Sequence, residues 1–327
     1  MISDTMDGRH SQPVLQVKDL NVRYGGRSGD ISILQDVDLA VMPGQVTAVV
    51  GESGSGKSTL VKSIMGLLPA NARLEGSIDL AGVRLDSLKG AARRKLNGSL
   101  VSLISQDALN SLNPSTPVGY QIAEMLMVHE GRSKADAMAQ AVELLARTGI
   151  PDAEKRARLY PHEFSGGMRQ RALIAMAICL RPKLLLADEP TTALDATVKL
   201  QVVKLIEGLR RDLGLSVLLV THDMGIVAAM ADNMIVMYAG RAVESGAVED
   251  LFANPRHPYT AALIQAVPSV SVWKQRLRNI PGAPPSPPFP AHGCAFEPRC
   301  GRAIELCASH VDHVETGGRT VRCNVPL

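Results

Sequence analysis

The sequence predicts an α/β fold in which helices cover a mainly parallel β-sheet. Two observations support this class. Short β-branched runs alternate with segments of helical apolar spacing through most of the chain, and a glycine-rich turn separates one such run from a helical segment. The 327 residues, of which 46% are hydrophobic, suffice for one large domain with an appendage or for two smaller domains.

The first half of the chain combines expected strands with one helix and an insertion. β-branched runs predict strands at residues 15–24, 31–41, 45–50, 76–82 and 99–105. A helix follows the third strand and is closed by Pro69. From Gly119 to Thr148 the apolar spacing is helical, which predicts a mostly helical insertion over about 107–165.

The α/β alternation resumes after the insertion. Helices are expected at 168–180 and 197–214, and strands at 183–190, 216–223 and 233–240. Six prolines within 281–290 then predict a stiff, extended connector. These changes divide the chain into a domain over 14–250 and an extension over 251–327, which ends in a cysteine-rich tail over 294–327.

The composition argues against several classes of protein. Lys and Arg number 35 against 32 Asp and Glu, a net charge of +3, and only 3% of residues are aromatic. No nucleic-acid partner is therefore expected. The longest apolar run, Ala172 to Leu180, is about half the roughly 18 residues of a membrane-spanning helix. The N-terminal residues include acids and no apolar stretch, so no secretory signal is expected.

A phosphate-binding loop is the strongest motif in the chain. Residues 51–59 match the pattern GxxxxGK[ST] between an expected strand and an expected helix. Backbone N–H groups of such a loop bind phosphate oxygens, Lys57 would reach the β- and γ-phosphates, and Ser58 would bind Mg²⁺. The alternative is a surface turn, which the flanking strand and helix disfavour. The expected ligand-binding residues are Gly51, Ser53, Gly54, Ser55, Gly56, Lys57, Ser58 and Thr59.

Two adjacent carboxylates end a later apolar run. Leu184 to Ala187 predict a buried strand, and Asp188 and Glu189 follow at its carboxyl end, where α/β sheets place their ligands. Asp188 would hold Mg²⁺, and Glu189 would act as general base toward the attacking water. Taken alone, the segment is equally typical of an exposed acidic turn; the phosphate loop in the same chain favours the catalytic interpretation.

A third motif, residues 164–171 (FSGGMRQR), resembles the LSGGQ signature of ABC-type ATPases, with Phe164 for Leu and Met168 for Gln. The resemblance implies a P-loop NTPase fold, with an ABC-type RecA-like core, an antiparallel β subdomain and a helical insertion. It also implies that Ser165, Gly166 and Gly167 complete the ATP site of a second subunit in a nucleotide-sandwiched dimer. A helix start of this kind is an anion site in its own right.

Other positions take their roles from the same resemblance. Gln106 matches the glutamine that senses Mg²⁺ and water, and residues 193–195, which end in Asp195, match the D-loop. His222 matches the switch histidine that contacts the γ-phosphate. Tyr24 resembles the aromatic residue that stacks on adenine, although a lone tyrosine after a strand is more often a core residue.

Segments outside these motifs resemble the oligopeptide, dipeptide and nickel importers of the family. They are SQDALNSLNP, FANPRHPYTAALIQAVP, IPGAPPSPP and GCAFEPRC. The resemblance implies an ATPase subunit at the cytoplasmic face of the cell membrane, which energises uptake of peptides or related solutes. Its implied partners are two membrane permease subunits, a second ATPase subunit, with a heterodimer favoured over a homodimer, and indirectly an extracytoplasmic solute-binding protein.

Four of the five cysteines lie in the tail: Cys294, Cys300, Cys307 and Cys323. Their spacing matches neither a zinc ribbon nor a common ferredoxin. Four thiolates fit a tetrahedral soft-metal site, and members of the resembling subfamily include [4Fe-4S] proteins. A [4Fe-4S] cluster is favoured; zinc, and cysteines that are unligated or paired, are the alternatives. Cys179, in an apolar helical segment, is expected in the core.

Two further functions compete with transport. A soluble ABC ATPase acting on ribosomes or DNA usually has two motif sets, a long coiled coil or a basic arm, and this chain has none of these. An iron–sulfur redox protein would leave the complete ATP site unexplained. The sequence therefore favours the importer ATPase, with the tail lying outside the catalytic machinery.

Overall fold

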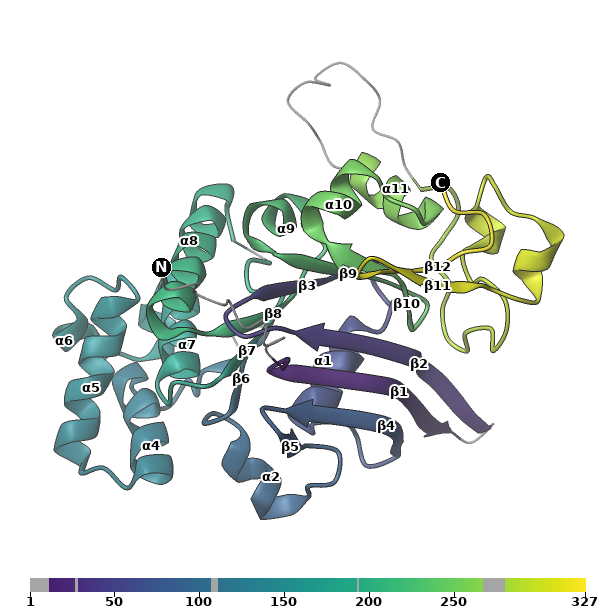
Figure 1. Cartoon of the computed structure of the whole chain (residues 1–327). Helices are drawn as coiled ribbons and strands as arrows, with labels where there is room; N and C mark the ends of the chain where they lie inside the picture. Colours follow the sequence, from purple (N-terminus) through teal and green to yellow (C-terminus); the bar gives the residue numbers. More distant parts are fainter. Residues whose placement is uncertain (1–11, 27–28, 107–110, 193, 267–279) are drawn as a thin grey trace, which may run out of the picture.

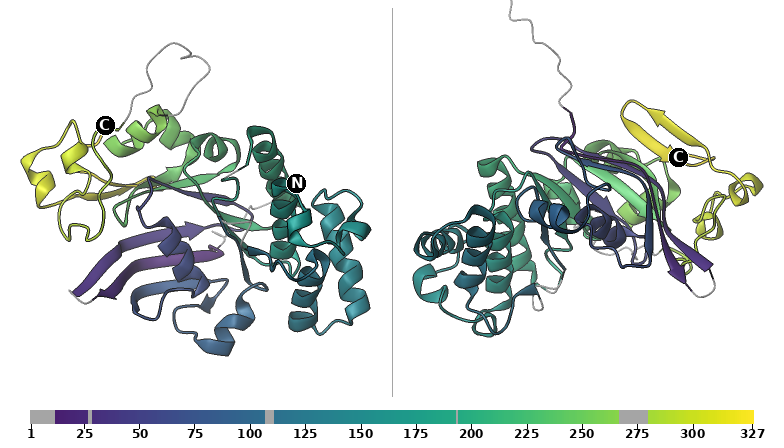
Figure 2. Two further views of the ribbon diagram at one scale, coloured as in Figure 1. Left: turned by 180° about the vertical axis from the view of Figure 1, so that it is seen from behind. Right: turned by 90° about the horizontal axis from the view of Figure 1, so that it is seen from below.

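A computed structural model describes residues 12–26, 29–106, 111–192, 194–266 and 280–327. Two β-sheets form its framework, and a lobe of helices lies at one end of the larger sheet (Figure 1). Seen from behind, the helical lobe and the cysteine-rich tail lie at opposite ends of the molecule (Figure 2).

The larger sheet has eight strands in the order β11-β12-β10-β9-β3-β8-β7-β6. The five strands from β9 to β6 are parallel. Most residues of these five strands are buried, as expected for apolar runs covered by helices on both faces. The bounds are β3 Val46–Val50, β6 Val101–Ile104, β7 Leu184–Asp188, β8 Ser216–Val220, β9 Asn233–Tyr238, β10 Arg241–Ala247, β11 His313–Thr316 and β12 Arg319–Arg322.

The smaller sheet is antiparallel, with the order β2-β1-β4-β5. In β2, buried residues alternate with exposed ones from Gln35 to Val41, which is typical of a sheet with one face on the core. The antiparallel subdomain that the family resemblance implied is therefore present. Its strands are β1 Leu15–Gly26, β2 Gly29–Val41, β4 Ala72–Leu80 and β5 Val83–Arg84.

Helices cover both faces of the larger sheet and build the lateral lobe (Figure 1). The lobe contains α4, α5 and α6, within the range where the sequence predicts a helical insertion. The α-helices are α1 Lys57–Met65, α2 Gly90–Leu96, α4 Val118–Glu130, α5 Lys134–Arg147, α6 Ala153–Arg156, α7 Gly166–Ile178, α8 Ala196–Leu213, α9 Met224–Met230, α10 Val248–Ala253 and α11 Pro258–Gln265. Short 3₁₀ turns occupy Pro161–Glu163, Glu297–Arg299 and Glu305–Ala308.

Three apolar clusters form the core. The largest joins the helical lobe to one face of the sheet, and the second joins the antiparallel sheet and α1 to the other face. The third lies under α9, α10 and α11 and includes Phe289 and Phe296 from the C-terminal extension. The extension therefore shares a core with the α/β domain.

The cysteine-rich tail also continues the larger sheet. Strand β12 pairs antiparallel with β10 through Val321 and Thr320, and β11 pairs with β12 as a hairpin (Figures 1 and 2). The tail that the sequence predicts beyond the connector thus packs onto the main domain, because β11 and β12 extend one edge of the central sheet. None of the helices in the described residues combines the length and apolar character needed to cross a membrane.

Candidate nucleotide-binding site

The phosphate loop follows β3 and leads into α1, as the sequence predicts. Gly56 has a φ of 102°, a left-handed conformation that favours glycine, and it precedes the first helical residue, Lys57. A Cβ atom at Gly51 would overlap the carbonyl oxygen of Met237. Two positions of the motif thus have glycine for a steric or conformational reason.

The side chain of Lys57, the first residue of α1, points back into the phosphate loop. Its ammonium donates hydrogen bonds to the carbonyl oxygens of Gly51 at 2.8 Å and Glu52 at 2.9 Å. The side chain is buried, and burial lowers the pKa of Lys57 despite the nearby acidic groups. Because its acceptors are mainly neutral carbonyls, the ammonium has positive charge available for an anion in the loop.

A cavity of about 640 Å³ opens over this loop. It brings together residues from the smaller sheet, the phosphate loop, the segments that follow β6, β7 and β8, and the C-terminal connector, and it includes seven of the eight predicted loop residues. Its lining is Tyr24, Ile33, Gly51, Ser53, Gly54, Gly56, Lys57, Ser58, Thr59, Gln106, Glu189, Thr192, His222 and Pro287. Ser55 instead is buried beside Lys57, where its hydroxyl lies 3.4 Å from the ammonium.

Asp188 ends β7 next to the loop. The Ser58 hydroxyl hydrogen-bonds to its carboxylate, while Oδ1 is buried and has no partner among the described residues. Burial, and then the charge of Glu189, raise the pKa of Asp188 above its ordinary value. A divalent cation at Ser58 and Asp188 would satisfy this oxygen, so the residues fit Mg²⁺.

Glu189 is held by three side chains from different segments. Its carboxylate accepts hydrogen bonds from the Gln106 amide at 3.2 Å and the Thr192 hydroxyl at 2.9 Å. Nδ1 of His222 lies 3.2 Å from its other oxygen. The sequence predicted Gln106, Glu189 and His222 in this region, and the structure brings all three together at the carboxyl ends of β6, β7 and β8.

The signature segment and Asp195 face a different cavity, of about 450 Å³. Ser165 caps α7 by accepting a hydrogen bond from the N–H of Met168 at 3.3 Å. Asp195 caps α8 through the N–H groups of Thr197 and Val198. The lining includes Ser165, Gly166, Gly167 and Asp195 but no residue of the phosphate loop. Ala193, the first residue of the expected D-loop, lies outside the described residues.

Tyr24 lies in β1 at the rim of the nucleotide cavity, with its hydroxyl 3.4 Å from that of Thr59. Sequence reasoning missed three other lining residues: Ile33, Thr192 and Pro287. Thr192 lies three residues after Glu189, so its spacing offered a signal. Pro287 lies 230 positions from Lys57, and only the folded chain brings it to this cavity. The proline-rich connector therefore contributes to this cavity, whereas no residue of the tail, 294–327, lines it.

The four tail cysteines are neighbours without forming a recognised metal site. Each is a free thiol, and Cys294 has electrostatic interactions with Cys300, Cys307 and Cys323. Burial raises the pKa of Cys294 to about 11. In the described residues, no group of three or more His, Cys, Asp or Glu side chains is arranged to hold a metal ion. This geometry gives no support to zinc or to an iron–sulfur cluster. Cys179 is buried in the core, as predicted.

Comparison with known proteins identifies relatives over nearly the whole chain. The ABC transporter family matches residues 34–192, and the C-terminal region of oligopeptide/dipeptide transporters matches residues 243–307. The oligopeptide transport ATP-binding protein OppD of Escherichia coli is 43% identical over 98% of this chain and 95% of its own. A putative peptide import ATP-binding protein of Brucella melitensis is 47% identical over 92% of this chain and 93% of its own.

Solved structures show the same fold. The dimeric post-hydrolysis state of the ATP-binding cassette MJ0796, bound to ADP and phosphate, is 25% identical with a TM-score of 0.64. The alignment covers 72% of this chain and 98% of that one. The cbiO1 subunit of Clostridium perfringens is 29% identical with a TM-score of 0.63, over 74% and 91% of the two chains. This chain belongs to the ABC transporter family and is an ABC-type ATPase.

Proposed function

We propose that this ATPase energises the uptake of peptides or related small solutes through membrane permease subunits. The observation that carries the proposal is the combination of the nucleotide cavity with a C-terminal region of the oligopeptide/dipeptide transporter type. The relatives named above are transport ATP-binding proteins. They favour this function over a soluble ABC ATPase that acts on ribosomes or DNA.

The site residues divide the work of hydrolysis. The loop residues from Gly51 to Thr59 bind the phosphates, and Tyr24 stacks on adenine at the rim of the cavity. Glu189 accepts a proton from the attacking water, and its position is set by Gln106, Thr192 and His222. His222, which is largely exposed, is free to turn toward a γ-phosphate.

Mg²⁺ would be held by the Ser58 hydroxyl and the unpartnered oxygen of Asp188, with Gln106 as a further ligand. When bound, the ion neutralises charge on the phosphate oxygens. Asp188, whose ionised form is disfavoured by burial, is stabilised as a carboxylate by such a cation.

A second ATPase subunit would complete the site. Ser165, Gly166, Gly167 and Asp195 line a cavity that is separate from the phosphate loop of the same chain. This separation supports the proposal that they serve another subunit's nucleotide. We propose a heterodimer of two such ATPases. It lies at the cytoplasmic face of the membrane on two permease subunits, with an extracytoplasmic solute-binding protein as an indirect partner.

We also propose the boundaries 14–250 for the ATPase domain, with its helical insertion at about 107–165, and 251–327 for the extension.

For the tail we propose a [4Fe-4S] cluster on Cys294, Cys300, Cys307 and Cys323, with zinc as the alternative. The proposal rests on the number and residue type of the four cysteines in the sequence, and the thiols must rearrange to ligate a metal. Anaerobic purification with iron and acid-labile sulfide analysis tests it, and a metal-free, fully active protein would refute it.

The catalytic assignment is tested by Glu189→Gln. The amide cannot accept the proton, so we expect loss of ATP hydrolysis with retained ATP binding and accumulation of a closed dimer. Glu143→Gln, an exposed position on α5, is the matched control and should hydrolyse ATP normally. Hydrolysis near the wild-type rate in Glu189→Gln would contradict the assignment.

The transport assignment is tested in membranes. Co-expressed with its permease subunits, the second ATPase subunit and the solute-binding protein, the wild-type chain should support peptide uptake into right-side-out vesicles loaded with ATP, and Glu189→Gln should abolish it. Sedimentation of the chain with ribosomes or DNA, rather than with membranes, would instead favour the soluble alternative.

A further inference from the structure

An ion pair joins the cysteine-rich tail directly to the phosphate loop. Arg299, which lies beside Cys300, donates to the two carboxylate oxygens of Glu52 at 2.6 and 3.1 Å. The Arg299 side chain is only 6% exposed and that of Glu52 is 24% exposed. A bidentate pair with little solvent fixes both position and orientation, which a single exposed contact does not.

Arg299 is itself fixed from several sides. Its guanidinium donates to the Tyr238 hydroxyl at 3.1 Å and to the carbonyl oxygen of Pro281 at 2.7 Å. It also lies over the rings of Tyr238 and Phe296, 5.8 Å from each centroid. The hydrogen bond to Glu52 is the main cause that raises the pKa of Arg299, so the guanidinium is charged at every relevant pH.

Glu52 is the loop residue that these contacts hold. Its backbone N–H donates to the hydroxyl of Tyr259 at 2.9 Å. Its carbonyl oxygen accepts from the Lys57 ammonium at 2.9 Å and from the N–H of Ser55 at 3.2 Å. The main chain of Glu52 is therefore part of the loop's internal hydrogen bonding, and its carboxylate links the loop to the tail.

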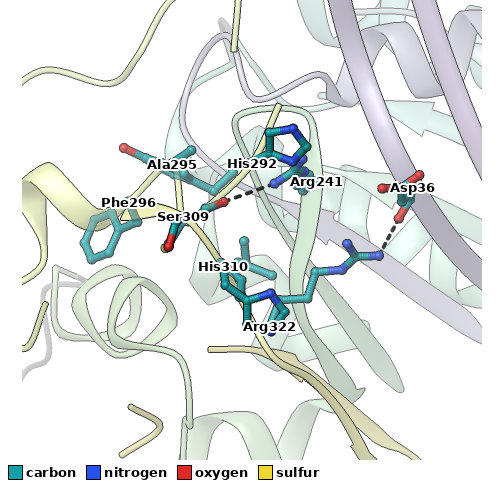
Figure 3. A pocket seen from close by; sticks show the side chains of 13 residues that line it. Asp36, Arg241, His292, Ala295, Phe296, Ser309, His310 and Arg322 are labelled. Atoms are coloured by element: carbon teal, nitrogen blue, oxygen red, sulfur yellow. Dashed lines mark hydrogen bonds between the residues drawn. The ribbon is translucent and has the colours of Figure 1, made fainter. Parts of the chain in front are cut away.

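The tail that carries Arg299 is anchored to the rest of the molecule. Arg241 of β10 donates to the carbonyl oxygens of Gly293 at 3.1 Å and Ala291 at 2.6 Å. Arg322 of β12 donates to the carbonyl oxygen of Asp36 in β2 at 2.8 Å. Both arginines line a cavity of about 170 Å³ between the tail and the two sheets (Figure 3). Phe296 is buried against Tyr238 and Tyr259.

We propose that Arg299 is a positioning residue for nucleotide binding, through which the cysteine-rich tail holds the phosphate loop in its binding conformation. The inference rests on the proposed role of residues 51–59 in binding phosphate. Phosphate is bound by loop N–H groups that must converge on one point. A loop ordered before binding loses less conformational entropy when the nucleotide binds. Nucleotide affinity therefore depends on a folded tail.

The experiment measures nucleotide binding and steady-state hydrolysis in the full-length chain. Arg299→Gln removes the charge and the bidentate geometry, and we expect about tenfold weaker binding of MgADP and MgATP. KM for ATP should rise by a similar factor, whereas kcat should change little because Glu189 and its partners are untouched. Arg299→Lys keeps the positive charge but not the bidentate guanidinium geometry, so its nucleotide affinity should lie between those of the wild type and Arg299→Gln.

Two further variants separate positioning from a folding defect. Arg302→Gln removes an exposed arginine of the same tail and should bind nucleotide as the wild type does. Glu52→Gln alters only the loop side of the pair and should reproduce the weakened binding. In the double variant Arg299→Gln/Glu52→Gln, the second substitution should add nothing, because the same interaction is already lost.

The outcomes distinguish this inference from the proposed function. Unchanged affinity in Arg299→Gln, or affinity losses that simply add in the double variant, would overturn the positioning role. Failure of the wild-type chain to bind MgADP at all would instead refute the phosphate-loop assignment. An equal loss of affinity in Arg302→Gln would also overturn the positioning role, because it would show a general defect of the tail.

Discussion

At the scale of single residues, the phosphate loop depends on glycines for different reasons. Gly51 has no room for a Cβ, because that atom would meet the Met237 carbonyl oxygen and the Ser55 hydroxyl. Gly54 has open space around it, but its φ of 82° favours glycine. The pattern GxxxxGK[ST] requires glycine at position 51 but not at position 54, whereas the structure shows a steric reason for the first glycine and a conformational reason for the second.

This difference predicts unequal costs for two similar substitutions. Gly51→Ala should lower the free energy of unfolding of the nucleotide-free chain by about 2–3 kcal/mol, because backbone atoms must move apart. Gly54→Ala should cost about 1 kcal/mol, the usual penalty for a left-handed non-glycine residue. Urea denaturation of the two variants measures the difference. Equal destabilisation would contradict the close packing of Gly51 against β9.

At the scale of elements, α11 shows how a short sequence motif determines a helix start. His257 is fully buried, and its Nδ1 accepts a hydrogen bond from the N–H of Tyr259 at 3.0 Å, with Pro258 at the first helical position. Because Nδ1 is an acceptor, the proton of the neutral ring is on Nε2. The same helix places the Tyr259 hydroxyl against the phosphate loop.

The buried cap predicts a specific loss of stability in acid. Burial lowers the pKa of His257 from 6.5 to about 4, so the unfolded chain binds a proton that the folded chain does not. Above pH 6.5 the neutral His257 ring costs the folded chain nothing. As the pH falls from 6.5 toward 4, the free energy of unfolding decreases by about 3 kcal/mol. His257→Asn keeps a capping oxygen and should flatten the unfolding free energy over this range.

The control for this measurement is His310→Asn, since His310 is exposed. Its pH profile of unfolding should keep the wild-type slope. A His257→Asn protein that still loses the same stability between pH 6.5 and 4 would show that another group titrates there.

At the scale of the whole molecule, a buried carboxylate joins three distant segments. Glu244 of β10 accepts hydrogen bonds from the N–H groups of Arg256 and His257, which precede α11. It also pairs with Arg319 of β12 at 3.0 Å, with 0% of Glu244 and 12% of Arg319 exposed. Arg319 donates in addition to the carbonyl oxygen of Asn254. We therefore expect the tail hairpin, the sheet and the C-terminal helices to unfold as one unit.

Removing that arginine should cost far more than removing an exposed one. Arg319→Ala leaves a buried carboxylate without its counter-charge, and we expect a loss of about 2–3 kcal/mol in unfolding free energy. The matched control is Arg73, which pairs with Asp30; the Arg73 side chain is 74% exposed and that of Asp30 is 34% exposed. Arg73→Ala should lower the free energy of unfolding by under about 1 kcal/mol. Calorimetric unfolding compares them; similar costs would argue against a single cooperative unit.

The proposed nucleotide chemistry could be predicted from the sequence, because it depends on local patterns. The loop from Gly51 to Thr59 and the carboxylates at Asp188 and Glu189 each lie at the end of a recognisable strand, and parallel strands bring their carboxyl ends to one edge. The α/β alternation and the helical insertion were predictable from apolar periodicity in the same way.

The position of the tail could not be predicted from the sequence and is known from the folded chain. Arg299 and Glu52 are 247 positions apart, and no periodicity or motif spacing relates residues at such a separation. Composition marked the proline-rich connector and the cysteine cluster as a separate piece, yet β12 pairs with β10 and Pro287 lines the nucleotide cavity. The pairing of β12 with β10 and the burial of Phe296 depend on which surfaces the folded core leaves uncovered. No local pattern in the sequence predicts those surfaces.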